Sequence, residues 1–294
     1  MKIDIANVSL SYGETRALID MSATIDGPSI TGLLGRNGSG KSSLLAVMAA
    51  FRAADSGQVT YDGQPVWENP AVTSQIALIR EGGDVYDEDE KLDEIFRYAE
   101  WLRPNWNAEL AKRLVDAFRL PPKTKLCDMS RGQRSAVGVI LGLAAQAPVT
   151  IFDETYLGMD APSRVQFYDL LLQEYIEQPR TFILSTHLIE EVSRILEQVI
   201  IIHEGRTLLQ TATDDLLGQG TAVTGPVDKV DAFVHGLTVI GTRALGRIRS
   251  ATVFGQLTSD QRLQARSLDL DLAPVELQDL FVHLTADTGK RDQA

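Results

Sequence analysis

The chemistry of this sequence centres on one glycine-rich stretch, which reads Gly35-Arg36-Asn37-Gly38-Ser39-Gly40-Lys41-Ser42. Its glycines let successive backbone N–H groups turn toward an anion, because side chains at those positions would block the approach. We expect Lys41 to neutralise the β- and γ-phosphates of a nucleotide and the Ser42 hydroxyl to ligate Mg²⁺. The apolar run 30–34 before the stretch and the helix-forming run 43–51 after it give the strand, loop and helix order that phosphate binding requires.

The helix that begins after this loop points its unpaired N–H groups and its positive dipole end at the same phosphates. A glycine-rich turn without a ligand is the alternative, and the flanking strand and helix disfavour it. The residues expected to contact the nucleotide here are Gly35, Arg36, Asn37, Gly38, Ser39, Gly40, Lys41, Ser42 and Ser43.

Two adjacent carboxylates, Asp153 and Glu154, follow the apolar run 149–152. Such a run predicts a buried parallel strand, and ligands of α/β sheets lie at the carboxyl ends of the strands. We expect Asp153 to hold Mg²⁺, directly or through water, and Glu154 to orient the attacking water. An ordinary acidic strand end is the alternative.

The run Thr181–His187 repeats this design, a buried strand that ends in polar residues and then enters a helix over 188–196. It places His187 at the same edge of the sheet, where a neutral imidazole can donate to the γ-phosphate or hold the water in line. Taken alone, His187 is more often a histidine at a helix start. The catalytic candidates are therefore Lys41, Glu154 and His187.

Two further features are weaker when taken alone. Ser130 and Gly132 start a small, apolar helical run to Ala145, and an N-cap with exposed N–H donors suits a second phosphate. A capped helix without a ligand explains them equally well. Tyr12 lies in a turn between two strands, where its ring can stack on a purine or simply pack on a strand end.

The elements that must position these residues alternate between strands and helices. Ile3 to Ile25 alternates apolar and polar residues and breaks at 11–14, which predicts two antiparallel strands. Further strands are expected at 57–63 and 75–79, and the pattern then turns helical from Leu92 to Leu120. These patterns predict an α/β fold with an antiparallel β region and a helical insertion.

Composition excludes several classes of protein. Forty acidic residues against 28 basic ones give the 294-residue chain a net charge of -12, which argues against a broad nucleic-acid surface. The only cysteine, Cys127, cannot form an internal disulfide, and the N-terminus shows no signal peptide, so we expect a cytosolic protein. Val137–Ala145 is far shorter than the ~20 residues that span a bilayer, so another chain would supply any spanning part.

Together these motifs resemble the ATP-binding subunits of ABC transporters, in order and spacing, over residues 1 to about 210. The resemblance implies a P-loop NTPase core with an antiparallel β subdomain and a helical insertion at about 92–146. It also implies that Tyr12 stacks on adenine. The context of Asp160, Arg164 and the run 186–192 looks most like a bacterial subgroup often linked to GntR-type regulators.

The resemblance implies partners as well. In this family Ser130 and Gly132, with Gln133, contact the γ-phosphate held by the partner subunit, and Asp160 lies in a loop at the same interface. Two ATP molecules would be sandwiched in a homodimer or in a pair with a related chain, and closure would drive a membrane permease. The expected location is cytoplasmic, peripheral on the inner face of the cell membrane.

Three departures from the family pattern bear on this expectation. Met129 and Arg131 replace a leucine and a glycine of the usual signature. Glu81 aligns with the glutamine that normally touches Mg²⁺ and water, and its carboxylate can still reach the metal. The usual Pro-Thr-Ser after the two carboxylates reads Thr-Tyr-Leu at 155–157. Because both carboxylates are intact, we expect ATP hydrolysis.

Residues 211–294 carry none of these motifs. Helices are expected at 227–235, 260–266 and 275–284 and strands at 237–242, 249–254 and 268–272, which predicts a small α+β accessory region. We expect this region to be structural or to stabilise a dimer, and a regulatory role is the alternative. For the whole chain, the alternative functions are a soluble ABC-type ATPase of translation or DNA repair and a nucleotide-binding regulator without catalysis. If the chain serves a transporter, export is favoured over import.

Overall fold

The computed structural model describes residues 1–80 and 89–286 of the chain. It divides the chain into two compact units, Met1–Gln210 and Thr211–Ala294. Of the predicted site residues, only Glu81 lies outside the described residues. No helix within those described ranges is both long and apolar enough to cross a membrane.

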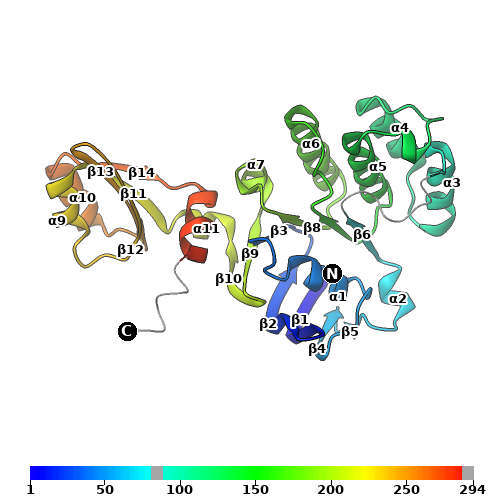
Figure 1. Ribbon diagram of the computed structural model, residues 1–294, viewed down its shortest axis with the longest axis horizontal. Coiled ribbons are helices and arrows are strands. Elements are labelled where there is room, and N and C mark those ends of the chain that lie inside the picture. The colour runs from blue at the N-terminus through cyan, green and yellow to red at the C-terminus, as the bar shows by residue number, and fades with distance from the viewer. Residues whose placement is uncertain (81–88, 287–294) are drawn as a thin grey trace. The chain divides into compact units, whose positions relative to one another are not determined.

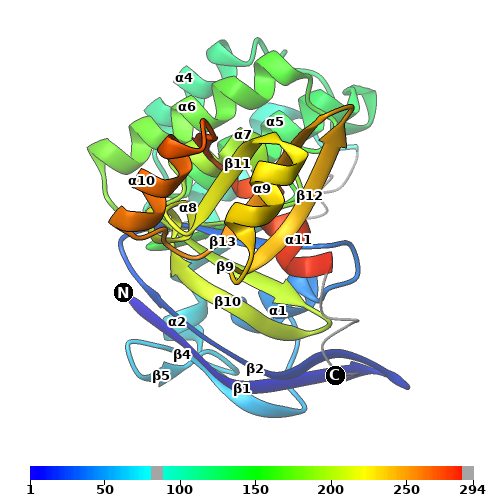
Figure 2. The ribbon, with the colours of Figure 1, turned by 90° about the vertical axis from the view of Figure 1, so that its left-hand side faces the viewer.

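A four-stranded antiparallel sheet opens the first unit, with strand order β2-β1-β4-β5 (Figures 1 and 2). Its two long strands pair from Lys2↔Asp26 to Tyr12↔Thr15, so the predicted antiparallel pair is confirmed. Alternate residues such as Ile3 and Ile5 point into the core. The strands are β1 (Lys2–Tyr12), β2 (Thr15–Asp26), β4 (Ser56–Tyr61) and β5 (Gln64–Pro65).

A six-stranded sheet, with order β10-β9-β3-β8-β7-β6, forms the centre of this unit. Within it, β9, β3, β8, β7 and β6 pair in parallel. The strand that leads into the phosphate loop, β3, therefore lies between β9 and β8, the strand that leads into His187. Their apolar runs are buried on both faces, as parallel sheets require. The strands are β3 (Ile30–Gly35), β6 (Ile76–Arg80), β7 (Val149–Asp153), β8 (Thr181–Thr186), β9 (Gln198–His203) and β10 (Arg206–Ala212).

Helices cover both faces of this sheet. Figure 1 shows α1 (Lys41–Met48) on one face and α5 (Arg131–Ala144) and α6 (Ala161–Glu177) on the other. Phe152 of β7 and Phe167 of α6 meet edge to face, with ring centroids 5.2 Å apart. A Cβ on Gly142 of α5 would lie 2.5 Å from the Phe152 ring, so α5 reaches the sheet closely only because glycine stands there.

The helical insertion contains two more helices, α3 (Leu92–Leu102) and α4 (Ala108–Ala117), and a 3₁₀ turn at Leu126–Asp128 before α5. A short helix, α2 (Pro70–Thr73), precedes β6. The single helix expected over 188–196 is wrong. The chain instead forms α7 (Ile189–Val192) and a 3₁₀ turn (Ser193–Ile195). The helix begins only after Leu188 because the Thr186 hydroxyl accepts the Leu188 N–H at 2.8 Å and holds that residue outside it.

The second unit folds around an antiparallel sheet of order β12-β13-β11-β14. From β11 onward its elements follow the β-α-β-β-α-β order of ferredoxin-like folds. Two helices, α9 and α10, lie on one face of the sheet and α11 on the other (Figures 1 and 2). The elements are α8 (Thr213–Leu217), β11 (Gly220–Pro226), α9 (Val227–Val234), β12 (Val239–Leu245), β13 (Ile248–Phe254), α10 (Ser259–Ser267), β14 (Asp271–Pro274) and α11 (Leu277–Ala286).

Candidate nucleotide-binding site

The phosphate loop joins the end of β3 to the start of α1. Gly38 and Gly40 adopt left-handed φ angles of 79° and 105°, which L side chains rarely take. A Cβ on Gly40 would also lie 2.5 Å from the carbonyl oxygen of Ala17 on β2. The loop therefore turns back on itself and packs against β2 in a way that only glycine allows.

Lys41 is buried at the foot of this loop, with 5% of its surface exposed. Its Nζ donates to the carbonyl oxygens of Gly35 at 2.9 Å and Arg36 at 3.4 Å, and it lies 3.7 Å from Glu154 Oε1. Burial lowers the pKa of Lys41, and the carboxylates of Glu154 and Asp153 oppose that shift. Two backbone carbonyls and one carboxylate thus surround the ammonium.

Glu154 lies between Lys41 and His187. Its φ of 50° is left-handed, which turns the chain sharply at the end of β7. The same Oε1 atom that faces Lys41 accepts a hydrogen bond from His187 Nδ1–H at 3.3 Å. The structure therefore brings the three catalytic candidates together through one carboxylate oxygen.

The residues expected to hold Mg²⁺ fit a hydrated cation. Asp153 is buried, and its Oδ1 has no hydrogen-bond partner within residues 1–80 and 89–286, so a metal or its water shell would satisfy that atom. Ser42 stands exposed in the first turn of α1. Among the described residues, no group of three or more acidic, histidine or cysteine side chains is placed to hold a metal ion by itself. In proteins, Mg²⁺ usually keeps several waters and binds through one or two carboxylates together with substrate phosphates.

The outer parts of the phosphate loop and Tyr12 face solvent. Arg36 and Asn37 are exposed, Ser39 is buried beneath them, and Ser43 is half-buried. The Tyr12 ring, at the end of β1, is 46% exposed, and the Arg52 guanidinium lies 5.3 Å from its centroid. One aromatic face therefore already contacts a cation, which is the kind of face that also stacks on a base.

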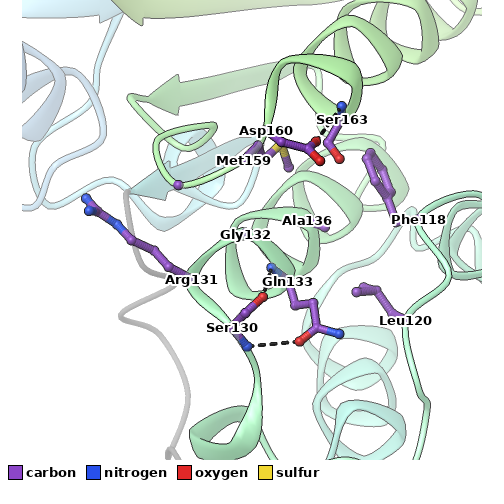
Figure 3. A pocket seen from close by; sticks show the side chains of 11 residues that line it. Phe118, Leu120, Ser130, Arg131, Gly132, Gln133, Ala136, Met159, Asp160 and Ser163 are labelled. Atoms are coloured by element: carbon purple, nitrogen blue, oxygen red, sulfur yellow. Dashed lines mark hydrogen bonds between the residues drawn. The ribbon is translucent and has the colours of Figure 1, made fainter.

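A second group of predicted residues meets at the start of α5. Ser130 is the N-cap of this helix: its Oγ accepts the Gln133 N–H at 3.2 Å, and Gln133 Oε1 accepts the Ser130 N–H at 2.9 Å (Figure 3). This capping box fixes the helix start and leaves the first N–H groups pointing outward. A Cβ on Gly132 would lie 2.9 Å from the Gly158 carbonyl oxygen, so the loop before α6 packs directly on this helix start.

These residues line a cavity of about 460 Å³ between α5 and the start of α6. Asp160 borders it and caps α6 by accepting the Ser163 N–H at 2.9 Å. Hydrogen bonding from the Ser163 side chain, and then from its backbone N–H, lowers the pKa of Asp160. Arg131 extends away from the other labelled side chains (Figure 3), and its stem packs on Gly158. Among the described residues, the lining of this cavity includes none from Gly35–Ser43. One chain therefore carries two separate groups of phosphate-binding candidates.

The family model described as "ABC transporter" matches residues 18–156, a range that holds the phosphate loop, the start of α5 and both carboxylates. The chain carries an ABC transporter ATP-binding domain. It is an ATPase of the ABC type, and its relatives favour a transporter subunit over a soluble ATPase of translation or DNA repair. Its core has the P-loop NTPase fold expected from the sequence.

Relatives cover the chain to different extents. The ABC transporter ATP-binding protein YtrB of Bacillus subtilis is 28% identical over 199 residues, which are 67% of this chain and 67% of YtrB. The Nod factor export ATP-binding protein I of Rhizobium etli is 25% identical over 303 residues, which are 96% of this chain and 93% of the Rhizobium etli protein. A solved ATP-binding subunit of an ABC transporter superposes with a TM-score of 0.66 at 23% identity, over 74% of this chain and 92% of that one.

One contact of the ABC domain has no signal in the sequence. Arg164 of α6 binds the Glu191 carboxylate through two nitrogens, at 2.7 and 2.8 Å, and donates a third hydrogen bond to the Met159 carbonyl at 2.8 Å. This bidentate pair joins the loop before Asp160 to the short helix after His187. The partners are far apart in sequence, so only the packing of α6 and α7 identifies them.

Proposed function

We propose that this chain pairs with a second copy, or with a related ATPase chain, and that the pair closes on two ATP molecules to drive a separate membrane permease. The observation that supports the proposal is the separation of the two groups of phosphate-binding residues. The phosphate loop does not line the cavity bordered by Ser130, Gly132 and Asp160. A nucleotide on the loop of one chain is thus completed by the helix start of another.

Each candidate has a role at this site. Lys41 and the N–H groups of the loop bind the β- and γ-phosphates, and Ser42 and Asp153 hold Mg²⁺, which would neutralise charge on the phosphate oxygens when bound. Tyr12 stacks on the base. The γ-phosphate displaces Glu154 from Lys41, which leaves that carboxylate available to orient water and accept its proton. His187 steadies Glu154 and reaches toward the same phosphate.

We further propose that residues 1–210 are the ATP-binding part and 211–294 an accessory region, with the protein held at the inner face of the cell membrane by its permease. Export is favoured, because two relatives that match over 96% of the chain are export ATP-binding proteins. The net charge of -12 argues against a nucleic-acid partner.

The Glu154→Gln variant tests the chemistry. It keeps the side chain's shape but cannot accept a proton, so it should bind ATP, dimerise, and turn over at about 1% of the wild-type rate or less. Size-exclusion chromatography and phosphate release measure the two properties. Glu177→Gln, at the exposed end of α6, is the matched control and should behave as wild type. Unchanged turnover in Glu154→Gln would remove this residue from its assigned role.

Purification of tagged protein from its native cells in mild detergent tests the transport role. A multi-spanning membrane chain in stoichiometric amount, identified by mass spectrometry, would support it. Ribosomal or repair factors without any membrane chain would leave the ATPase intact and overturn the coupling to transport.

A further inference from the structure

Tyr156 is wholly buried, two positions after Glu154 in the chain. Its hydroxyl donates to Thr186 Oγ1 and lies 3.4 Å from the Ser185 carbonyl oxygen. Both acceptors belong to the end of β8, the strand that leads into His187. The side chain therefore reaches from the loop after one catalytic candidate to the strand end before another.

The acceptor of this hydrogen bond also controls the backbone on both sides of His187. Thr186 Oγ1 accepts the Leu188 N–H at 2.8 Å, which closes a tight turn with His187 at its centre. Thr186 is itself fully buried, so its hydroxyl has no access to water that could replace a lost protein donor. Its orientation depends on the protein groups around it.

Burial keeps Tyr156 a donor. It raises the pKa of this phenol far above its usual range, although the hydrogen bond to Thr186 opposes the shift, so the hydroxyl is protonated at every working pH. A constant donor fixes the Thr186 rotamer, and the Thr186 rotamer fixes the turn that presents His187 Nδ1 to Glu154.

We infer that Tyr156 is a positioning residue for ATP hydrolysis, acting through Thr186 to hold His187 against Glu154. It touches neither nucleotide nor metal, and the inference rests on the proposed roles of Glu154 and His187. Its effect should fall on the chemical step and leave ATP binding unchanged, because the loop around Lys41 makes no contact with this hydroxyl among those the structure describes.

The same cluster contains a matched control. Tyr168 is also fully buried, and its ring centroid lies 6.0 Å from that of Tyr156. Its hydroxyl has no hydrogen-bond partner among the described residues. Tyr168→Phe therefore makes the same chemical change in the same aromatic cluster without removing a hydrogen bond.

The experiment measures steady-state phosphate release by the full chain with MgATP. We expect Tyr156→Phe to lower kcat by about fivefold, the worth of one neutral hydrogen bond, with the KM for ATP unchanged within about twofold. Tyr168→Phe should match wild type in both constants. A purely structural role for the Tyr156 hydroxyl would lower the melting temperature but leave kcat unchanged; equal kcat in the two variants would overturn the inference.

Changes at the acceptor give a second readout. Thr186→Ser keeps the hydroxyl and should retain wild-type kcat, whereas Thr186→Val should lose at least as much as Tyr156→Phe. The double variant Tyr156→Phe with Thr186→Val should lose no more than Thr186→Val alone, because both remove the same hydrogen bond. Additive losses would contradict a path from Tyr156 through Thr186.

His187→Ala separates this inference from the proposed function. If that variant hydrolyses ATP as fast as wild type, the role of His187 falls and the inference falls with it. If His187→Ala is slow while Tyr156→Phe equals Tyr168→Phe, the proposed function stands and only the role of Tyr156 is overturned.

Discussion

At the scale of single residues, the surroundings of Lys41 predict a change of its protonation when ATP binds. Its ammonium is held by two loop carbonyls and by Glu154, and burial lowers its pKa below the ordinary 10.5. The phosphates of ATP bring more negative charge than these partners do. Nucleotide binding should therefore raise the pKa of Lys41 again.

This shift predicts proton uptake on ATP binding at alkaline pH. Between the lowered pKa of Lys41 in the protein alone and its higher pKa in the complex, the free protein holds fewer protons than the complex, so binding takes up a proton and affinity falls as pH rises. Calorimetric titrations in two buffers of different ionisation enthalpy, at about pH 8 and about pH 9.5, measure the uptake. Lys41→Met should abolish it. The same uptake in Lys41→Met would assign the proton to another group.

The placement of these residues at one edge of the sheet could be predicted from the sequence, but their contacts could not. Asp153 and His187 each follow an apolar run, and strand ends of a parallel sheet meet at one edge. The shared oxygen of Glu154 and the reach of Tyr156 to Thr186 depend on how side chains pack between β7 and β8. No sequence pattern encodes such contacts, because the partners lie about thirty positions apart.

At the scale of elements, the Ser130 hydroxyl at the N-terminus of α5 has a structural role as a helix cap, and we propose that it also binds phosphate. Ser130 caps this helix through a capping box with Gln133. Thr258 caps α10 through the same box with Gln261, in a unit that carries no nucleotide motif. The two helices allow the structural role of a cap to be separated from a role in binding.

Ser130→Ala and Thr258→Ala should each lower the free energy of unfolding of their own unit by about 1 kcal/mol, because each loses an N-cap. Only Ser130→Ala should weaken the ATP-dependent pairing of two chains. Chemical denaturation measures the free energy of unfolding. Sedimentation velocity with ATP, on a Glu154→Gln background, measures the pairing of two chains. Equal pairing by both variants would exclude the Ser130 hydroxyl from the interface.

Elements with a clear period were predicted well, and irregular ones were not. The antiparallel pair β1 and β2 alternates apolar and polar residues over most of its length, with register shifts between Ile5 and Ser11, and this pattern was sufficient to predict the pair. The strand β11 lies inside the sheet of the second unit but reads Gly-Thr-Ala-Val-Thr-Gly-Pro, which is poor in strand-forming residues. A Cβ on its Gly225 would lie 2.5 Å from the Leu270 side chain, so close packing requires glycine at this position. Glycine has a low strand propensity, which weakens the sequence pattern that would predict β11.

At the scale of the whole molecule, the two units have separate cores. The second is built on buried apolar residues of β11, α9, β13 and α10, among them Val223, Phe233 and Val253. The first ends on β10, where the Gln210 amide bonds to both the N–H and the carbonyl of Thr24 on β2. Gln210 thus ties the last strand of the first unit to its antiparallel sheet.

A fragment that ends after Ala212 should keep β10 and fold alone. We expect fragment 1–212 to unfold cooperatively and to bind ATP with the affinity of the full chain within about threefold, because the phosphate loop and its surroundings lie within it. Circular dichroism and calorimetry measure both. A fragment that ends after Gly205 removes β10 and should be less stable. If 1–212 failed to fold while the full chain did, the second unit would be part of the first unit's core.

The loop before α5 also contains a single site for a spectroscopic label. Cys127, exposed in the 3₁₀ turn just ahead of Ser130, is the only thiol in the chain, so one maleimide dye or spin label attaches at one known place without removal of any native cysteine. In a symmetric pair the two labels would mark the two signature loops. Energy transfer or pulsed dipolar spectroscopy between the two labels would follow the closure of the pair, in a chain that carries no substitution.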